Sequence, residues 1–284
     1  MNIQSLSIVV PTGECWNHCK FCVSRQHCEK YGEDIVSAQN IPQSYLNRIS
    51  FVRDEGCNSM ILTGTAEPQQ NLPFIYALLD KNWQLRKPFY NISLQTTGTN
   101  LNPEEIKNLA IAGITTLALS ISSLNDERNW DIIGAPEKVR TMELIDLITC
   151  AKENGMNVRA CLNLTDEFKE QKPGMLFIWA KENNIDQVTF RKIYKNGSNI
   201  ESKWIEEHEF EDRKFSTIKD YVKLNGHPIT RLPYGYIQFS VHGISTVIDD
   251  NCMAKENIEE MKYAILRPNG HLYSRWDDTG SLIF

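Results

Sequence analysis

The chain has 284 residues and a formal net charge of −6, and its basic and acidic residues are mixed along its length. This composition lacks the basic footprint of a dedicated nucleic-acid-binding protein, so we expect no nucleic-acid partner. No apolar run reaches the length of a membrane span, so we also expect no membrane partner. The first ten residues lack the charged start of a signal peptide, which predicts a cytoplasmic location.

Six short segments rich in β-branched and apolar residues follow one another along the first two thirds of the chain. They are 6–10, 59–63, 91–96, 116–121, 157–162 and 187–193. Helical periodicity lies between them: Pro42 and Pro103 each begin a predicted helix, and the strongest periodic stretch covers 139–151 and ends near Gly155. Alternation of strand and helix at intervals of about thirty residues predicts βαβ units and a parallel sheet.

Polar or glycine-rich clusters follow all six predicted strands. They cover 15–22, 64–68, 97–98, 122–125, 163–166 and 194–197. Sheets of this kind place their chemistry at the carboxyl ends of the strands, whether they are closed barrels or open sheets. The sequence therefore predicts one shared site built from these loops.

The character of the sequence changes after residue 200. Residues 201–223 are highly charged and predict a solvated helix or loop, while 234–248 alternates like a strand pair that turns at Gly243. Residues 263–273 predict a hairpin around Asn269 and Gly270, because Asn-Gly is a strong turn signal. We predict a core over residues 1–200 and an extension over 201–284 that covers the barrel opening.

Three of the eight cysteines lie in the loop after the first predicted strand, as Cys15, Cys19 and Cys22. This CxxxCxxC spacing favours a soft metal site, and three thiolates on a cubane iron–sulfur cluster leave one iron open. A zinc site that uses His18 or Cys28 as its fourth ligand is the alternative, together with unligated thiols. The cysteines expected to pack as small hydrophobic residues are Cys57, Cys150 and Cys161.

The cysteine loop, with Phe21 just before its last cysteine, resembles the signature of the radical S-adenosylmethionine (SAM) superfamily. Residues 62–68 resemble the family's GGEP loop, although Thr63 and Thr65 with Ala66 depart from its usual glycine pair. Residues 95–98 resemble the TNG turn, and 119–134 is similar to a stretch of the MoaA-like, molybdenum-cofactor cyclase branch. The resemblance covers roughly residues 5–200.

This resemblance implies an α/β fold, a partial (β/α)6 TIM-like barrel with a C-terminal extension that contains a β-hairpin. It implies one 4Fe-4S cluster held by Cys15, Cys19 and Cys22, and SAM as the second cofactor. The reduced cluster of such enzymes cleaves SAM to a 5′-deoxyadenosyl radical, which takes a hydrogen atom from the substrate.

The resemblance and the strand ends together give a set of expected SAM-binding residues. The set is Phe21, Gly64, Thr65, Glu67, Thr97, Ser120, Ser122, Asn163 and Arg191. For each single polar residue the alternative is a hydrogen bond within the loops or the barrel interior. No residue is assigned a catalytic role of its own.

Residues 249–252 and 264–276 resemble the auxiliary SPASM/twitch pattern, in which a cysteine precedes a hairpin. Ser274 and Arg275 stand where the second cysteine would be expected, and one cysteine, Cys252, cannot hold a cluster. We expect a degenerate auxiliary region without a second cluster; an unrelated hairpin is the alternative. Expected substrate contacts, or simply a solvated surface, are Asp249, Asp250, Arg267, Arg275, Asp277 and Asp278.

The absence of a second cysteine set bears on the substrate. It disfavours the molybdenum-cofactor cyclase reaction and, more weakly, peptide maturation. The first hypothesis is a radical SAM enzyme acting on a small metabolite or nucleotide. The second is a peptide- or protein-modifying enzyme, either a peptide maturase or a glycyl-radical activating enzyme, and the third is a non-catalytic iron or zinc protein. A flavodoxin or ferredoxin is the expected electron donor.

Overall fold

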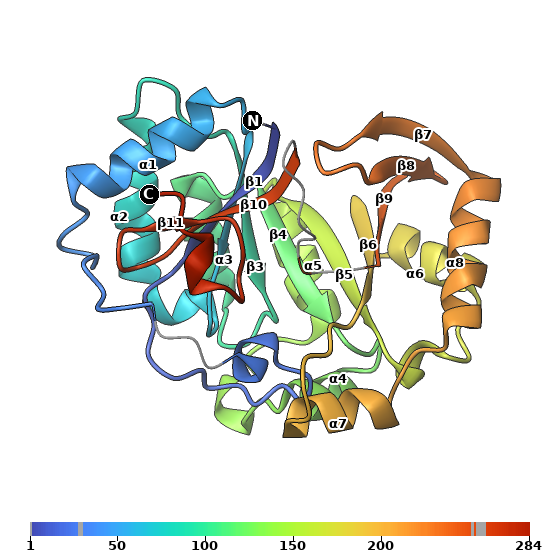
Figure 1. The fold of residues 1–284 in the computed structure, drawn as a ribbon. Coiled ribbons are helices and arrows are strands. Elements are labelled where there is room, and N and C mark those ends of the chain that lie inside the picture. Colours follow the sequence, from blue (N-terminus) through green and yellow to red (C-terminus); the bar gives the residue numbers. More distant parts are fainter. Residues whose placement is uncertain (1, 28–30, 251–252, 254–259) are drawn as a thin grey trace.

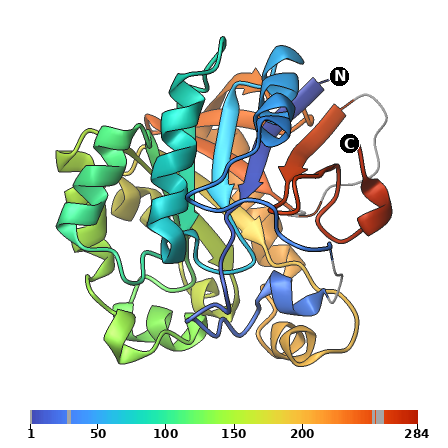
Figure 2. The same ribbon diagram turned by 90° about the vertical axis from the view of Figure 1, so that its left-hand side faces the viewer.

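The computed structural model describes residues 2–27, 31–250, 253 and 260–284. In this part of the chain, one curved sheet of eleven strands runs through the molecule in the order β11-β10-β1-β2-β3-β4-β5-β6-β9-β8-β7. Helices lie against its outer side, and the sheet does not close into a complete barrel (Figures 1 and 2). The predicted α/β class and open TIM-like barrel are confirmed.

The first six strands are parallel and follow the chain order across the sheet. They are β1 (Asn2–Val9), β2 (Ser59–Thr63), β3 (Asn91–Thr96), β4 (Thr116–Ile121), β5 (Asn157–Leu164) and β6 (Gln187–Lys192). Each matches a predicted segment to within a few residues. Strands of a parallel sheet are covered on both faces and are therefore rich in apolar residues. This is why the sequence predicts them as short apolar runs.

Two later strands extend this parallel sheet, which the sequence did not predict. β9 (Ile244–Asp249) pairs in parallel with β6, and β10 (Glu260–Leu266) pairs in parallel with β1. Eight consecutive strands are therefore parallel, from β10 through β1–β6 to β9. Pairing between segments so far apart in the chain has no local sequence signal, so only the hairpins of this region were predicted.

Both predicted hairpins are present. β8 (Ile237–Val241) pairs antiparallel with β9 through a turn at His242 and Gly243, and β7 (Gly226–Arg231) lies outside β8 at the sheet edge. β10 pairs antiparallel with β11 (Leu272–Tyr273), and Gly270 takes φ +82° in the connecting turn. Residues beyond 200 thus form both edges of the sheet; the division of the chain at residue 200 stays a prediction.

Eight α-helices connect or cover the strands of the described chain. They are α1 (Gln43–Asp54), α2 (Leu72–Trp83), α3 (Pro103–Ala112), α4 (Asp126–Ile133), α5 (Leu144–Glu153), α6 (Pro173–Glu182), α7 (Ile200–Glu207) and α8 (Asp212–Asn225). Pro42 and Pro103 mark helix starts as predicted, and an Asn102–Glu105 capping box supports α3. In Figure 1, α4 and α7 lie at the carboxyl ends of the strands, near the cysteine loop.

One predicted helix begins later than its periodicity indicated. Residues Glu137–Val139 form a separate 3-10 turn, and α5 begins only at Leu144. The backbone N–H of Leu144 donates to Asp126 Oδ1 at 2.8 Å, so a side chain from α4 satisfies the first turn of α5. That contact is tertiary, and hydrophobic periodicity alone could not show it.

The gap between β9 and β10, called the seam below, is bridged by side chains. Lys262 Nζ on β10 lies 2.8 Å from Asp249 Oδ1 on β9, and the two side chains are 3% and 8% exposed. Arg231 also pairs with Glu260, and the backbone N–H of Tyr234 donates to Gln4 Oε1. The two halves of the open barrel are therefore held together by polar contacts.

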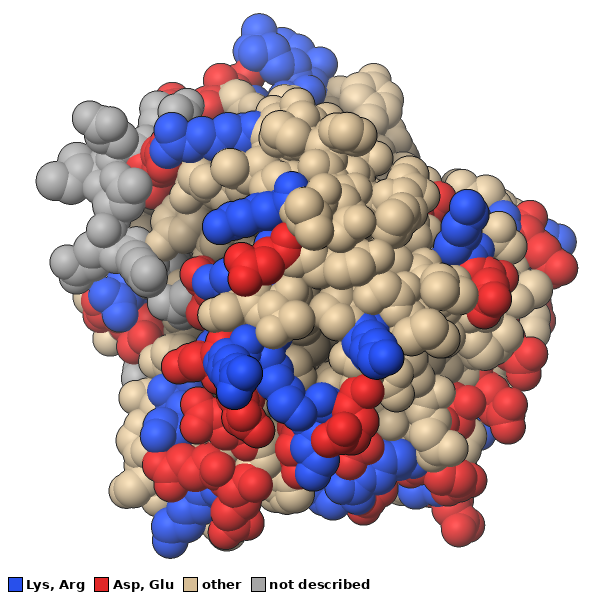
Figure 3. Space-filling view, turned by 90° about the vertical axis from the view of Figure 1, so that its right-hand side faces the viewer, with Lys and Arg blue, Asp and Glu red and all other residues tan. Residues whose placement is uncertain are grey.

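None of the described helices is long and apolar enough to cross a membrane. Figure 3 shows the face over β7, β8 and α8, where Lys and Arg side chains lie among Asp and Glu side chains. The mixture of charges predicted from the sequence therefore also holds on this face of the folded chain.

Candidate functional site

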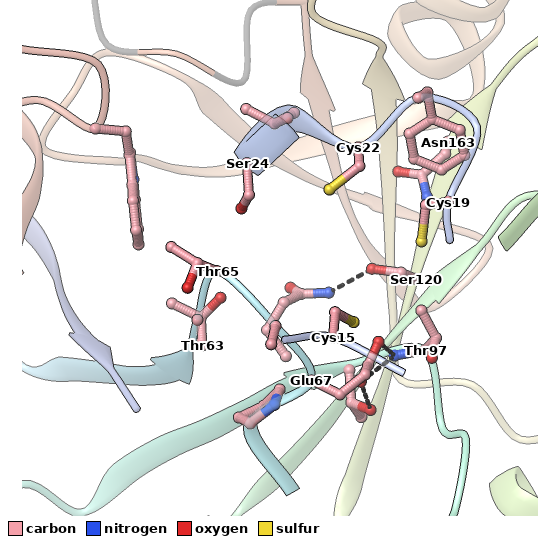
Figure 4. Close-up of a pocket in the computed structure, with 18 of the residues that line it drawn as sticks. Cys15, Cys19, Cys22, Ser24, Thr63, Thr65, Glu67, Thr97, Ser120 and Asn163 are labelled. Carbon is pink, nitrogen blue, oxygen red and sulfur yellow. Dashed lines mark hydrogen bonds between the residues drawn. The ribbon is translucent and has the colours of Figure 1, made fainter. Parts of the chain in front are cut away.

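The three cysteines of the signature lie in the loop after β1 and line one cavity of about 310 Å³. Figure 4 shows the sulfur atoms of Cys15, Cys19 and Cys22 pointing into the same space. All three thiols are free of disulfide bonds and half-buried. A turn in which the backbone N–H of Cys22 donates to Cys19 O at 3.2 Å brings the last two ligands together.

The end of α4 holds the middle of this loop. The backbone N–H of His18 lies 3.1 Å from both Ile133 O and Gly134 O, and that of Lys20 donates to Ile132 O at 3.0 Å. Gly134 is the C-cap of α4 with φ +58°, and a Cβ there would lie 2.5 Å from His18 O. The free carbonyls at a helix end thus become acceptors for the cysteine loop.

Gly134→Ala is expected to displace the cysteine loop. The left-handed conformation costs an alanine about 1–2 kcal/mol, and the added Cβ meets His18 backbone that cannot move aside without moving the loop. We expect iron retention about 10-fold weaker, the scale of a lost supporting contact at a metal site. Gly155→Ala is the matched control, because Gly155 has φ +75° but nothing within 4 Å of its Cβ position. Equal iron retention in both variants would contradict the role of Gly134.

Asn17 connects the loops that follow the first three strands. Its side chain is 1% exposed, and Nδ2 lies 3.3 Å from Glu67 Oε1 and 3.0 Å from the hydroxyls of Thr97 and Thr99. The Glu67 carboxylate also accepts from Thr96 Oγ1 at 2.7 Å. We did not single out Asn17 from the sequence; its position between two ligand cysteines was the only signal available.

Burial raises the pKa of two of the three thiols and so favours their protonated form. Desolvation raises the pKa of Cys15, while hydrogen bonds from the backbone N–H groups of Asn17 and Glu67 act in the opposite direction. Burial and then the neighbouring Cys22 raise the pKa of Cys19 well above its ordinary value, with Arg25 lowering it slightly. Bound metal would supply the positive charge that makes the thiolates stable here.

Most of the residues predicted to bind SAM line the cysteine cavity. They are Phe21, Gly64, Thr65, Glu67, Thr97, Ser120, Asn163 and Arg191. Ser122 is not among the lining residues that the structure describes; its side chain is fully buried and its hydroxyl accepts from Asn163 Nδ2 at 3.4 Å. The structure therefore brings eight of the nine residues to one place, and it sets Ser122 behind Asn163.

Two charged residues of this set have side-chain partners in the fold. Glu67 is 7% exposed and accepts from Thr96, Gln69 and Asn17. Arg191 Nε lies 3.4 Å from Asp249 Oδ2, so a residue that lines the cavity also contacts the Asp249 carboxylate of the seam.

The described cysteines outside the cysteine loop lie in the protein interior, as predicted from the sequence. Cys57, Cys150 and Cys161 are buried, which confirms that they pack in the interior. His18 is exposed, and its Nδ1 lies 2.7 Å from Arg25 Nη2. Cys28 and Cys252 lie outside the described residues.

The residues present fit an iron–sulfur cluster. Three soft thiol donors from one loop point into one cavity. Within the described residues, no three His, Cys, Asp or Glu side chains converge closely enough to hold a single metal ion. A cubane cluster needs no such convergence, because each thiolate binds a different iron.

The C-terminal region supplies one wall of the cavity. The residues of this wall are Met253 and the aromatic Tyr263 and Trp276. The backbone carbonyl of Trp276 accepts from Tyr31 Oη at 2.6 Å and from Arg267 Nη2 at 2.8 Å, which fixes this residue in place. Arg267 is 5% exposed and lies over the Tyr31 ring, so its contacts are structural and its role as a substrate contact stays a prediction.

The sheet is an open parallel barrel, and three cysteines follow its first strand. These two features together are typical of enzymes that hold an iron–sulfur cluster at the carboxyl ends of the strands. The sequence matches the radical SAM superfamily over residues 9–170, more than half of the chain. The chain belongs to the radical SAM superfamily. The family uses a 4Fe-4S cluster and SAM and acts enzymatically, as the sequence predicted.

Solved structures share this fold at low sequence identity. SuiB of Streptococcus suis, bound to S-adenosylmethionine, is 14% identical with a TM-score of 0.61, over 95% of this chain and 60% of SuiB. anSMEcpe with bound AdoMet and Kp18Cys peptide is 14% identical with a TM-score of 0.60, over 98% of this chain and 78% of that protein. HydG, a maturase of the [FeFe]-hydrogenase, is 12% identical with a TM-score of 0.56, over 76% and 48%.

This chain therefore spans about three fifths of the length of SuiB. No curated protein matches its sequence.

Proposed function

We propose that this protein binds one 4Fe-4S cluster through Cys15, Cys19 and Cys22 and uses SAM to abstract a hydrogen atom from a small metabolite or nucleotide. The observation that supports this most directly is the shared cavity: three free thiols point into it, and eight predicted SAM-binding residues line it. A cavity of about 310 Å³ lies within the size range of small-molecule and cofactor sites, which supports the binding of SAM there.

When bound, the cluster and SAM supply a one-electron cleavage that yields a 5′-deoxyadenosyl radical. The protein's part is to hold and orient the reactants and to exclude water. Gly64 and Thr65, after β2, are suited to present backbone groups to the SAM amino group. Ser120 and Asn163, at the ends of β4 and β5, offer hydrogen bonds to its polar oxygens. The wall of Tyr263 and Trp276 is left for the substrate.

Peptide or protein modification is the second proposed function. SuiB has been solved bound to its precursor peptide SuiA, and anSMEcpe with bound peptides, and each match covers 95% or more of this chain. Both are below 25% identity, so the likeness concerns the fold. A peptide substrate would place one side chain in the cavity and leave the rest of its chain outside.

Anaerobic reconstitution tests the shared part of both proposals. We expect about four irons per chain and a broad absorbance near 400 nm for one cubane cluster. Reduced protein incubated with SAM should release 5′-deoxyadenosine. A content of one zinc per chain without bound sulfide would contradict both proposals, and about eight irons would contradict the single cluster.

The substrate class needs a separate measurement. Deuterated metabolite and nucleotide pools, and separately a deuterated peptide library, would be incubated with the loaded enzyme and SAM. Transfer of deuterium into 5′-deoxyadenosine from the first set supports the small-molecule proposal, and transfer only from peptides supports the second. We propose the cytoplasm as the location and a flavodoxin or ferredoxin as the reductant, because free thiols and a reduced cluster need a reducing compartment.

A further inference from the structure

The inner faces of β5 and β6 are polar. Asn163 and Arg191 line the cysteine cavity, and side chains alternate between the two faces of a strand, so every second residue before them also faces the barrel interior. Phe190, on the opposite face of β6, packs against Phe177 of α6 with ring centroids 5.7 Å apart. Barrels of this kind usually fill their interior with apolar side chains, so a polar inner face is suited to a polar ligand. The inner positions before the cavity are Arg159, Cys161, Gln187 and Thr189.

Arg159 is a cation on this inner face. It lies opposite Gln187 in the register of β5 and β6, and its Nε donates to Gln187 Oε1 at 2.8 Å. In the part of the chain that the structure describes, no carboxylate pairs with it. The side chain is half-buried, and burial lowers the pKa of Arg159, as does the positive charge of Arg191, while Cys161 acts in the opposite direction. The fold therefore removes this guanidinium partly from water without giving it a negative partner.

Arg191 carries a second positive charge on the same face, at the cavity itself. Among the described residues that line the cavity it is the only basic one. Its Nε lies 3.4 Å from Asp249 Oδ2, and the other oxygen of that carboxylate lies 2.8 Å from Lys262 Nζ. Asp249 thus faces two cations at once and orients Arg191 from the side of the seam. The inner face of β5 and β6 therefore presents two guanidinium groups and no carboxylate of its own.

We infer that the substrate carries a carboxylate or phosphate group, which binds inside the barrel to Arg159 and Arg191. The planar, always charged guanidinium group matches both anions and binds them through paired N–H donors. Such an anion would supply the negative charge that the fold withholds from Arg159. The inference rests on the proposed function, since it concerns the substrate of the radical reaction. It assigns Arg191 to the substrate and leaves SAM to the loops after β1–β5.

The first test measures anion binding directly. Inorganic phosphate and, separately, acetate would be titrated by calorimetry into the reconstituted enzyme with SAM bound. One of the two should bind the wild type, and Arg159→Met should weaken that binding about 10-fold, the scale of one hydrogen bond to a charged group. Arg159→Lys should weaken it less, because it keeps the charge and loses only the planar fork. If neither anion binds, if Arg159→Met binds as tightly as the wild type, or if it weakens SAM binding equally, the inference is overturned.

Thermal unfolding of the metal-free protein separates a binding role from a structural one. Arg159→Met should leave the midpoint unchanged or raise it, because it removes a partly desolvated charge that has no carboxylate partner. A lower midpoint together with unchanged anion binding would make Arg159 structural. Arg86→Met is the matched control: Arg86 is 80% exposed and faces Asp54 at 3.4 Å on the surface. It removes the same charge and should change neither anion binding nor the midpoint.

The second test uses the reaction. A deuterated pool of small metabolites and nucleotides would be separated on an anion exchanger, and each fraction incubated with the loaded enzyme and SAM. Deuterium should enter 5′-deoxyadenosine only from the retained fraction, and phosphatase treatment of that fraction should abolish transfer for a phosphate but not for a carboxylate. Transfer only from the unretained fraction, or only from peptides, overturns the inference. If the wild type forms no cluster or cleaves no SAM, the proposed function fails, and anion titration of the metal-free protein still decides the inference.

Discussion

Cys19→Ala is expected to remove the iron centre and the activity together. Two remaining thiolates cannot hold a cubane cluster, and Cys19 lies between the other two ligands in the loop. Changes in groups that only support metal ligands already cost 10–100-fold in affinity or activity, so loss of a ligand should cost more than about 100-fold. Iron should fall from about four per chain to less than about one, and 5′-deoxyadenosine release should fall to background.

The matched control is Cys150→Ala. Cys150 lies on α5, is 8% exposed and has no place in the cysteine cavity. Its removal should leave iron content, the absorbance near 400 nm and product release unchanged. Wild-type product yield from Cys19→Ala would refute the ligand assignment, and parallel loss in Cys150→Ala would point to a general defect in folding.

Asp249→Asn is expected to destabilise the fold strongly. Its carboxylate faces Lys262 at 2.8 Å and Arg191 at 3.4 Å, and Asp249 and Lys262 are both almost fully buried. Removing one partner of a buried ion pair costs about 3–5 kcal/mol of unfolding free energy, because the other charge stays buried without compensation. For a chain of this size that corresponds to a fall in Tm of roughly 10 °C.

Lys262→Met should cost less than Asp249→Asn, because Arg191 continues to face the carboxylate. The double variant should be less destabilised than the sum of the two, with a coupling of about 0.5–3 kcal/mol. Urea unfolding of the metal-free protein measures each value. Lys195→Met is the control: Lys195 pairs with Glu206 on the surface, and its loss should leave the unfolding midpoint almost unchanged. Strict additivity at the seam would contradict a direct interaction between Asp249 and Lys262.

Ionisation of the Asp249 side chain makes the stability of the fold depend on pH. Burial acts to raise the pKa of Asp249, but Lys262, Arg191 and hydrogen bonds outweigh it, and the pKa is lowered from 3.8. Asp249 therefore stabilises the fold above pH 3.8, and this contribution is lost as pH falls through the lower folded-state pKa. Asp249→Asn should flatten that part of the stability profile. If the slope of unfolding free energy against pH below pH 4 were the same in Asp249→Asn and the wild type, Asp249 would not be the source of this pH dependence.

Much of the core follows from local features of the amino-acid sequence. The six strands β1–β6 were legible because each is a short buried apolar run followed by polar residues, and the proline-led helices α1 and α3 carry local start signals. The cysteine loop was legible because metal ligation needs residues of one type at fixed spacing. These signals lie within a few residues of each other, so no tertiary information is needed to detect them.

The two ends of the sheet depend instead on pairing between distant segments of the chain. β9 and β10 read as hairpin strands in the sequence, yet they add to β6 and β1 and meet through Asp249 and Lys262. Asn17 likewise gains its role from a partner 50 residues away, and Gly134 from one more than 100 residues away. Hydrogen bonds and ion pairs form between whichever groups the fold brings together, and a single sequence carries no local mark of such distant partners.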